Sequence, residues 1–154
     1  MENAENIFQK ALSFVLKWEG GYVNNPNDKG GATNRGITQY TYNTWLVAQG
    51  KPRKDVKFIS ETEVREIYRK NYWVKTGCDK MSKIFAVICF DTAVNMGISR
   101  VKEFLRVAAW CDTEKFLNAR EAKYREFATY GNQKIFLQGW LNRLNALRKF
   151  VKEI

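Results

Sequence analysis

The chain contains no histidine among its 154 residues, and it has only three cysteines and two prolines. The cysteines, Cys78, Cys89 and Cys111, form no close pair and no CxxC motif. The sequence therefore argues against a zinc site of cysteine and histidine, and against a Ser-His or Cys-His catalytic pair. We expect no metal and no cofactor, and we expect Cys89 and Cys111, which stand in apolar helical runs, to be reduced core residues.

Long apolar runs are missing as well. No segment reaches the roughly 18 uninterrupted apolar residues of a membrane span. The N-terminal stretch opens with acidic residues, and Gln9, Lys10 and Lys17 interrupt its apolar positions, which is unlike a signal peptide. We therefore expect a protein that is made in soluble form without an export signal of its own. Its length and its 45% hydrophobic content suit one compact domain.

Acidic residues are few compared with basic ones, 16 against 26, which leaves a formal net charge of +10. The excess lies in residues 51–83, with ten basic and five acidic side chains, and in residues 113–154, with nine and four. A positive field favours an anionic partner, such as nucleic acid, anionic lipid or an anionic polymer of the cell envelope. Charge alone does not choose among these three.

Strand patterns are almost absent, and helical periodicity dominates. Apolar residues recur at helical spacing from Ile7 onward, with Asn6 as a possible N-cap and Gly20 as a stop. Ser60 and Glu63 form a capping box, and Ser99 can cap a later helix. We predict a mainly α fold, with further helices over 38–50, 59–73, 83–97, 99–110, 113–130 and 133–153.

One carboxylate stands where the pattern predicts apolar surface. Glu19 lies four residues after Val15 and seven after Leu12, so its side chain should point along the core face of the first helix. The following residues, 20–38, are rich in glycine, asparagine and aspartate, and they predict a long turn-rich loop or a small hairpin. A loop of this length in a compact domain is more often functional than not.

A carboxyl group in this setting suits acid catalysis of glycoside cleavage. That reaction needs a protonated carboxylic acid beside the leaving oxygen and usually a second carboxylate. Asp28 is the nearest carboxylate in the loop, and the hydroxyl groups of Thr33 and Thr38 could position a water molecule. On spacing alone the alternatives stay open, since Glu19 could be a solvated helix end, Asp28 a turn residue and Thr38 a helix cap.

The segment "EGGYVNNPNDKGGATNRGIT", residues 19–38, resembles the signature of glycoside hydrolase family 108, the peptidoglycan N-acetylmuramidases of lysozyme-like fold. Three further blocks follow in the order and approximate spacing of that family. They are "IYRKNYW" at 67–73, "CD" at 78–79 and "FDTAVNMG" at 90–97. The resemblance implies a lysozyme-like helical domain with a glycine-rich loop or small hairpin after the first helix.

The C-terminal segment "FLQGWLNRLNAL", residues 136–147, is similar to a segment that is often identified as a peptidoglycan-binding region in such proteins. The resemblance thus covers nearly the whole chain. It implies one lysozyme-like catalytic domain over 1–154, with a catalytic core in 1–97 and a C-terminal helical part in 98–154.

The resemblance also implies roles for individual residues. Glu19 occupies the position of the catalytic acid, and Asp28 is the candidate second carboxylate, as a base, an electrostatic stabiliser or only a turn former. Asn25 stands where an acid is common, which removes one competitor of Asp28. Asn95 shares a helical face with Asp91, so a buried hydrogen-bonding pair is its alternative role. The residues expected to contact substrate are Tyr22, Thr33, Thr38, Tyr72, Trp73 and Asn95.

The function predicted from this resemblance is hydrolysis of the β-1,4 bond between N-acetylmuramic acid and N-acetylglucosamine in peptidoglycan. We expect a monomeric phage or prophage endolysin that stays in the host cytoplasm until a separate partner releases it to the wall. Its basic surface could also hold anionic envelope polymers or lipids. The alternatives are a non-catalytic peptidoglycan-binding module and a basic helical nucleic-acid binder, although no nucleic-acid-reading motif is present. The sequence leaves open whether the anomeric configuration is retained or inverted.

Overall fold

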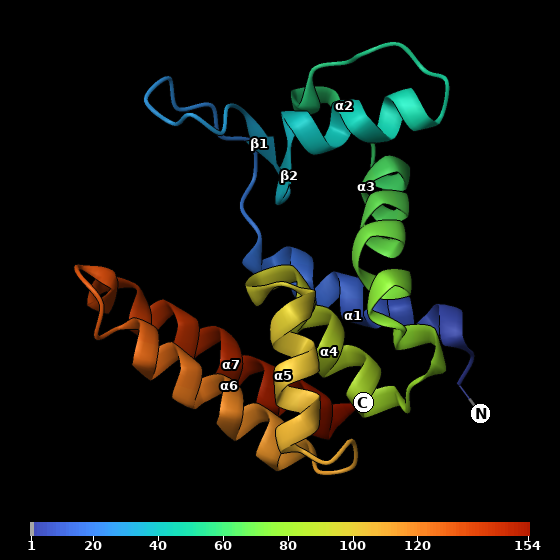
Figure 1. Cartoon of the computed structure of the whole chain (residues 1–154). Coiled ribbons are helices and arrows are strands. Elements are labelled where there is room, and N and C mark those ends of the chain that lie inside the picture. The colour runs from blue at the N-terminus through green and yellow to red at the C-terminus, as the bar shows by residue number, and fades with distance from the viewer. Residues whose placement is uncertain (1) are drawn as a thin grey trace. The chain divides into compact units, whose positions relative to one another are not determined.

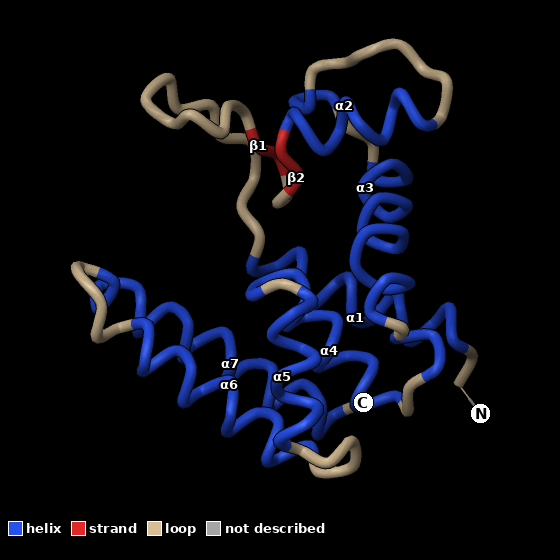
Figure 2. The backbone as a smooth tube through the Cα atoms, in the orientation of Figure 1, coloured by secondary structure: helices blue, strands red, loops and turns tan. Residues whose placement is uncertain are grey.

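A computed structural model describes residues 2–154 of the chain, which divides into two compact units, Met1–Val74 and Lys75–Ile154 (Figure 1). Helices make up most of both units, and the strands drawn in red in Figure 2 lie in the first unit. The mainly α class is therefore confirmed. None of the helices formed by residues 2–154 combines the length and the apolarity that a membrane span needs.

The first unit begins with helix α1, which spans Ala4–Trp18. Its N-cap is Asn3, whose side-chain oxygen accepts the backbone N–H of Asn6 at 2.8 Å. The prediction of Asn6 as the cap is therefore wrong, because a polar side chain three residues earlier already satisfies that N–H. The rest of this unit comprises β1 (Thr33–Asn34), β2 (Ile37–Thr38), α2 (Gln39–Ala48), a 3₁₀ turn (Val56–Phe58), α3 (Glu61–Tyr68) and a π-helical turn (Arg69–Val74).

The glycine-rich loop closes as a small antiparallel hairpin of β1 and β2, one of the two outcomes predicted for it. Thr33 pairs with Thr38, and Asn34 pairs with Ile37. The two turn residues between the strands, Arg35 and Gly36, have φ angles of 50° and 78°. Positive φ at both central residues matches the right-handed twist of the strands, which is why this tight turn ends in glycine.

Helices α2 and α3 begin at the caps that the sequence indicates. The predicted capping box is confirmed, since Ser60 Oγ accepts the Glu63 N–H at 3.1 Å and Glu63 Oε1 accepts the Ser60 N–H at 3.0 Å. The other oxygen of Glu63 accepts the buried hydroxyl of Tyr42 at 2.9 Å, and Lys54 lies 3.5 Å from Oε1. One buried carboxylate thus joins α2 to the start of α3.

The second unit is built around α4, Lys83–Met96, in which every residue from 85 to 93 is buried. The next helix, α5, spans Ile98–Val107 and follows Gly97, so Ser99 lies inside the helix and the prediction that it caps the helix is wrong. Figure 1 shows α6 and α7 side by side and antiparallel. The remaining elements are the 3₁₀ turns Cys78–Lys80 and Gln133–Phe136, α6 (Thr113–Phe127) and α7 (Leu137–Glu153).

A buried carboxylate, Asp91, ties α4 to α6 and α7. Its Oδ2 accepts Arg120 Nη1 at 2.7 Å, and its Oδ1 accepts Arg143 Nη2 at 2.8 Å and Nε at 3.0 Å. Burial alone would raise the pKa of Asp91, but the two guanidinium groups outweigh burial and hold that pKa below its usual value. The bonds continue from Arg120 to the Tyr124 hydroxyl, which donates to Asn95 Oδ1.

All three cysteines are free, and Cys89 is buried as predicted. Cys111 is exposed, which corrects the expectation that it is a core residue. The reason is that α5 ends at Val107, and Ala109 and Trp110 then take positive φ angles of 47° and 62°. The chain turns at this point, so Cys111 lies in a surface turn and not on the face of a helix.

A candidate active site around Glu19

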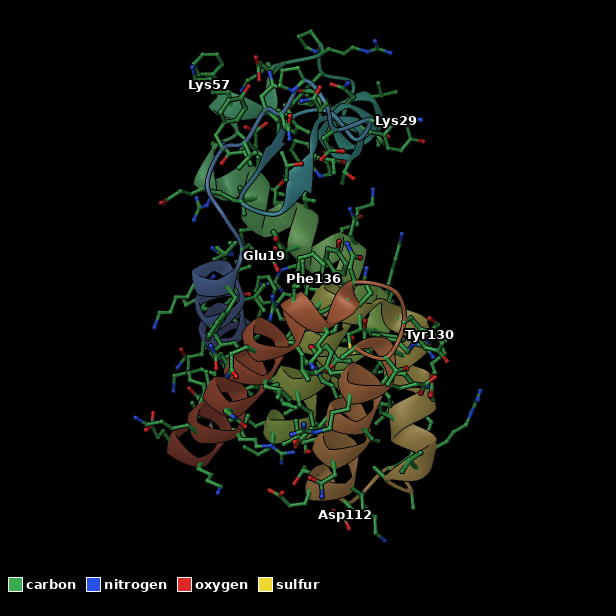
Figure 3. All side chains as sticks on the ribbon, turned by 90° about the vertical axis from the view of Figure 1, so that its left-hand side faces the viewer. Glu19, Lys29, Lys57, Asp112, Tyr130 and Phe136 are labelled. Atoms are coloured by element: carbon green, nitrogen blue, oxygen red, sulfur yellow. The ribbon has the colours of Figure 1, made fainter. Side chains whose placement is uncertain are left out.

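Glu19 is the C-cap of α1, where its backbone N–H still donates to the Val15 carbonyl at 3.2 Å. Its side chain is half-buried and lies at the point where the α1 ribbon gives way to the loop (Figure 3). A methyl group built on the α-carbon of Gly36 would be 2.9 Å from Glu19 Oε2 and 3.1 Å from Cγ. The carboxylate therefore lies directly against the turn of the hairpin.

The same turn is bonded to α3. The hydroxyl of Tyr68 donates to the carbonyl oxygen of Arg35 at 2.7 Å, and a methyl group on Gly36 would be 2.4 Å from that hydroxyl oxygen. The end of α1, the hairpin turn and the end of α3 thus meet around the Glu19 carboxylate. Two independent reasons favour glycine at position 36. Its φ of 78° suits glycine, and a side chain has no space there.

Tyr72, a residue expected to contact substrate, lies beside this carboxylate. Its ring centroid is 5.5 Å from that of Tyr68, and its side chain is half-buried. Burial raises the pKa of the Tyr72 phenol, and the negative charge of Glu19 raises it further. The phenol therefore stays protonated at neutral pH and can act as a hydrogen-bond donor next to Glu19.

Trp73, in contrast, is a core residue. Its side chain is 2% exposed and packs edge-on against Phe8, with ring centroids 5.2 Å apart. The prediction that Trp73 contacts substrate is therefore wrong, because an indole that is 2% exposed offers a sugar ring no surface on which to stack. Large aromatic side chains at helical spacing most often have this role.

Asp28 is exposed and forms a turn within the loop. Its Oδ1 accepts the Gly30 N–H at 2.8 Å, its N–H donates to the Asn25 carbonyl at 2.9 Å, and its carbonyl accepts the Gly31 N–H at 3.1 Å. These bonds match the turn-forming alternative for an aspartate that precedes glycines. A catalytic role for Asp28 stays a prediction.

The two threonines and Tyr22 lie in the same unit as Glu19. Thr33 and Thr38 are paired across the hairpin, and the Thr38 hydroxyl caps α2 by accepting the Thr41 N–H at 3.1 Å. Tyr22 is 38% exposed, and the ammonium group of Lys57 lies 5.7 Å from its ring centroid. Thr38 therefore has a structural task as a helix cap, whereas Tyr22 keeps a ring surface open to solvent.

Asn95 lies on α4 in the second unit, where its side-chain oxygen accepts the Tyr124 hydroxyl. The alternative predicted for it was a hydrogen-bonding pair with Asp91. The observed connection is indirect and runs from Asp91 through Arg120 and Tyr124 to Asn95. Asn95 is thus part of a polar network inside its own unit.

Sequence reasoning missed Arg35, Gly36 and Tyr68 as parts of this site. The dipeptide Arg35-Gly36 between "TN" and "IT" was a readable signal of a two-residue hairpin turn. Tyr68 carried no such signal. Its partner Arg35 is 33 residues away, and its position in the helix pattern indicates only a buried face.

The chain is similar to a known protein family and to a solved structure. Residues 12–97 match the family model of Glycosyl hydrolase 108. The structure is similar to the solved structure of Brucella abortus SagA, with a TM-score of 0.75 and 28% sequence identity, over 97% of this chain and 96% of that chain. A comparison with curated proteins found no match. The family match includes Glu19, the hairpin and Tyr68, and the predicted lysozyme-like, mainly α fold is confirmed.

Proposed function

We propose that this chain, which belongs to the Glycosyl hydrolase 108 family, cleaves the β-1,4 bond between N-acetylmuramic acid and N-acetylglucosamine in peptidoglycan. In this proposal Glu19 is the general acid that protonates the leaving oxygen. The observation that carries the proposal is the placement of the half-buried Glu19 carboxylate at the end of α1, against the hairpin turn at Gly36.

The surroundings of Glu19 suit an acid catalyst. A general acid must lie within hydrogen-bond reach of the leaving oxygen, and its position must be held during the reaction. The backbone of Glu19 is held by the last hydrogen bond of α1, and its carboxylate lies against the backbone of Gly36. Tyr72, whose pKa is raised by its own burial and by the charge of Glu19, offers a protonated phenol near this carboxylate.

We assign the second carboxylate to Asp28. Its loop is exposed throughout residues 20–31, directly after the half-buried Glu19, so water and a polysaccharide can reach it. Retention of configuration requires the two carboxyl groups about 5 Å apart, and inversion roughly 6.5–9.5 Å. The exposed ring of Tyr22, with Thr33 on the paired strand, is proposed to contact the sugar chain.

The charge of the chain supports an anionic, wall-associated substrate. A net charge of +10 concentrates the protein on negatively charged polymers and lipids of the cell envelope. The similarity to SagA extends over both units, which supports one catalytic domain over the whole chain. We further propose that the protein acts as a monomeric endolysin that meets peptidoglycan after release from the host cytoplasm.

Product analysis tests this function. Purified peptidoglycan is digested with the wild-type protein, the products are reduced with borohydride, and the soluble fragments are identified by mass spectrometry. We expect new ends that carry reduced N-acetylmuramic acid. New ends on N-acetylglucosamine would assign a different bond, and protein that sediments with peptidoglycan without releasing fragments would identify a binding module.

A further inference from the structure

We propose that Tyr68 is a positioning residue, whose hydroxyl fastens the hairpin turn Arg35–Gly36 against the carboxylate of Glu19. This inference rests on the proposed role of Glu19 as the acid. It concerns a residue that makes no contact with the reacting bond and acts only through the turn and the carboxylate.

A hydrogen bond from Tyr68 joins α3 to the turn. Tyr68 is 1% exposed, and its hydroxyl donates to the Arg35 carbonyl at 2.7 Å. The hairpin has only two paired residues on each strand, with one further bridge from Val23 to Thr33. A ladder this short is marginal by itself, so the phenol supplies an anchor that its own strands lack.

Gly36 is tightly packed against both neighbours. The α-carbon of Gly36 is so close to both neighbours that a methyl group there would be 2.4 Å from the Tyr68 oxygen and 2.9 Å from Glu19 Oε2. The phenol oxygen and the carboxylate therefore both lie against the same side of Gly36 and leave no room for a side chain there. Any outward movement of the turn opens space beside the carboxylate.

Tyr68 is itself held in place by its helix and by a neighbouring ring. Tyr68 is the last residue of α3, a helix that is capped at its start by Ser60 and Glu63. Its ring packs 5.5 Å from that of Tyr72, with planes tilted by 36°. The phenol is thus held by a capped helix on one side and by an aromatic neighbour on the other.

Loss of such an anchor should affect the chemical step more than substrate binding. A displacement of about 1 Å in a catalytic group can reduce the rate about 100-fold. Binding contacts made by exposed residues such as Tyr22 do not involve Tyr68. A fall in kcat with little change in KM is therefore the expected signature.

The test compares Tyr68→Phe with Tyr42→Phe. Tyr42 is also fully buried in this unit, and its hydroxyl donates to Glu63 at 2.9 Å, so both variants delete one buried donor and keep the ring. On soluble glycan fragments of peptidoglycan, we expect Tyr68→Phe to lower kcat by about 10-fold to 100-fold and to leave KM within about twofold. Equal kcat values for the two variants would overturn the proposal.

A double-mutant cycle tests whether Tyr68 acts through Glu19. If it does, Tyr68→Phe adds no further loss when it is combined with Glu19→Gln, because the positioned group is already gone. If Tyr68→Phe lowers the residual rate of Glu19→Gln by the same factor as in the wild type, the two residues act independently and the proposal fails.

Hydrogen exchange tests the anchor without any activity. We expect the backbone amides of residues 34–38 to exchange about tenfold faster or more in Tyr68→Phe and to be unchanged in Tyr42→Phe, since local opening sets exchange rates. Unchanged exchange in Tyr68→Phe would overturn the anchor. If the wild-type protein cleaves no glycan, the proposed function fails, and exchange still decides whether Tyr68 holds the turn.

Discussion

The α-carbon of Gly36 lies against the carboxylate of Glu19, so closely that an added methyl group would be 2.9 Å from Oε2. The two residues are 17 positions apart, yet the hairpin returns the chain to the end of the helix it has just left. Gly36 is constrained in two ways, because its backbone has a positive φ and because no space is left for a side chain. The surroundings of the candidate acid therefore depend on a glycine as much as on the acid itself.

Replacement of Gly36 and of Gly50 by alanine should distinguish the effect of lost space beside Glu19 from the effect of backbone strain at positive φ. Gly36→Ala is expected to destabilise the protein by about 1–3 kcal/mol and to remove most of the activity, because the turn must move away from Glu19. Gly50→Ala is the matched control, since Gly50 has a φ of 67° and no atom within 4 Å of an added methyl group. Urea unfolding and peptidoglycan clearing check both. Equal activity in the two variants would contradict this view of Gly36.

Asp28→Asn should distinguish a catalytic carboxylate from a turn former. Asparagine can accept the Gly30 N–H as Asp28 Oδ1 does, so the turn and the stability should be retained. If Asp28 is the second carboxylate, removal of its charge lowers the rate about 100-fold or more, as is observed when other groups that stabilise charge in a transition state are removed. An Asp28→Asn protein with the wild-type rate would leave only the turn-forming role.

The buried ion pairs of Asp91 predict a pH-dependent stability. Because its pKa is lowered in the folded protein, its contribution is fully present above the unfolded value of about 3.9 and is lost as the pH falls through the lower folded value. Asp91→Asn should cost about 3–5 kcal/mol, since it leaves Arg120 and Arg143 buried without a counter-charge.

Urea unfolding between pH 3 and pH 7 measures this contribution. The difference in unfolding free energy between wild type and Asp91→Asn should be constant near neutral pH and should shrink below about pH 4. A difference that stays the same down to pH 3 would show that the charge of Asp91 does not carry the effect.

The cysteines should differ sharply in reactivity. Burial raises the pKa of the Cys89 thiol to about 12 and also raises that of Cys78, whereas Cys111 is exposed. Labelling with iodoacetamide at pH 8 should modify only Cys111 in the folded protein and all three thiols in urea. Rapid labelling of Cys89 under native conditions would show that the core of the second unit opens.

Local sequence signals predicted most of the helices correctly, but two of the predicted N-caps, Asn6 and Ser99, were wrong. The Ser60–Glu63 box and the hairpin after the first helix could be predicted because each depends on residues a few positions apart. The errors arose where another residue nearby took the role of the N-cap or where a turn ended a helix earlier than its apolar pattern indicated. Asn3 displaced Asn6 as the cap of α1, and left-handed backbone at Trp110 placed Cys111 on the surface.

The candidate site could be predicted only in part, for a related reason. A helical stripe and a motif indicated Glu19, but the contact of Glu19 with Gly36 and the hydrogen bond of Tyr68 to Arg35 join positions far apart in the sequence. Periodicity marks a face as buried without saying which partner covers it. Trp73 illustrates the same limit, since only the three-dimensional contact with Phe8 shows that its ring is covered.

The role of Glu19 as general acid is tested most directly by the rate of glycosidic bond cleavage by wild type, Glu19→Gln and Glu66→Gln on the same purified peptidoglycan. Glu66 is an exposed residue of α3 in the same unit, so it controls for the chemical change. We expect a loss of about 100-fold or more in Glu19→Gln, full activity in Glu66→Gln and unchanged binding to peptidoglycan in both. A Glu19→Gln protein that releases fragments at the wild-type rate would contradict this role.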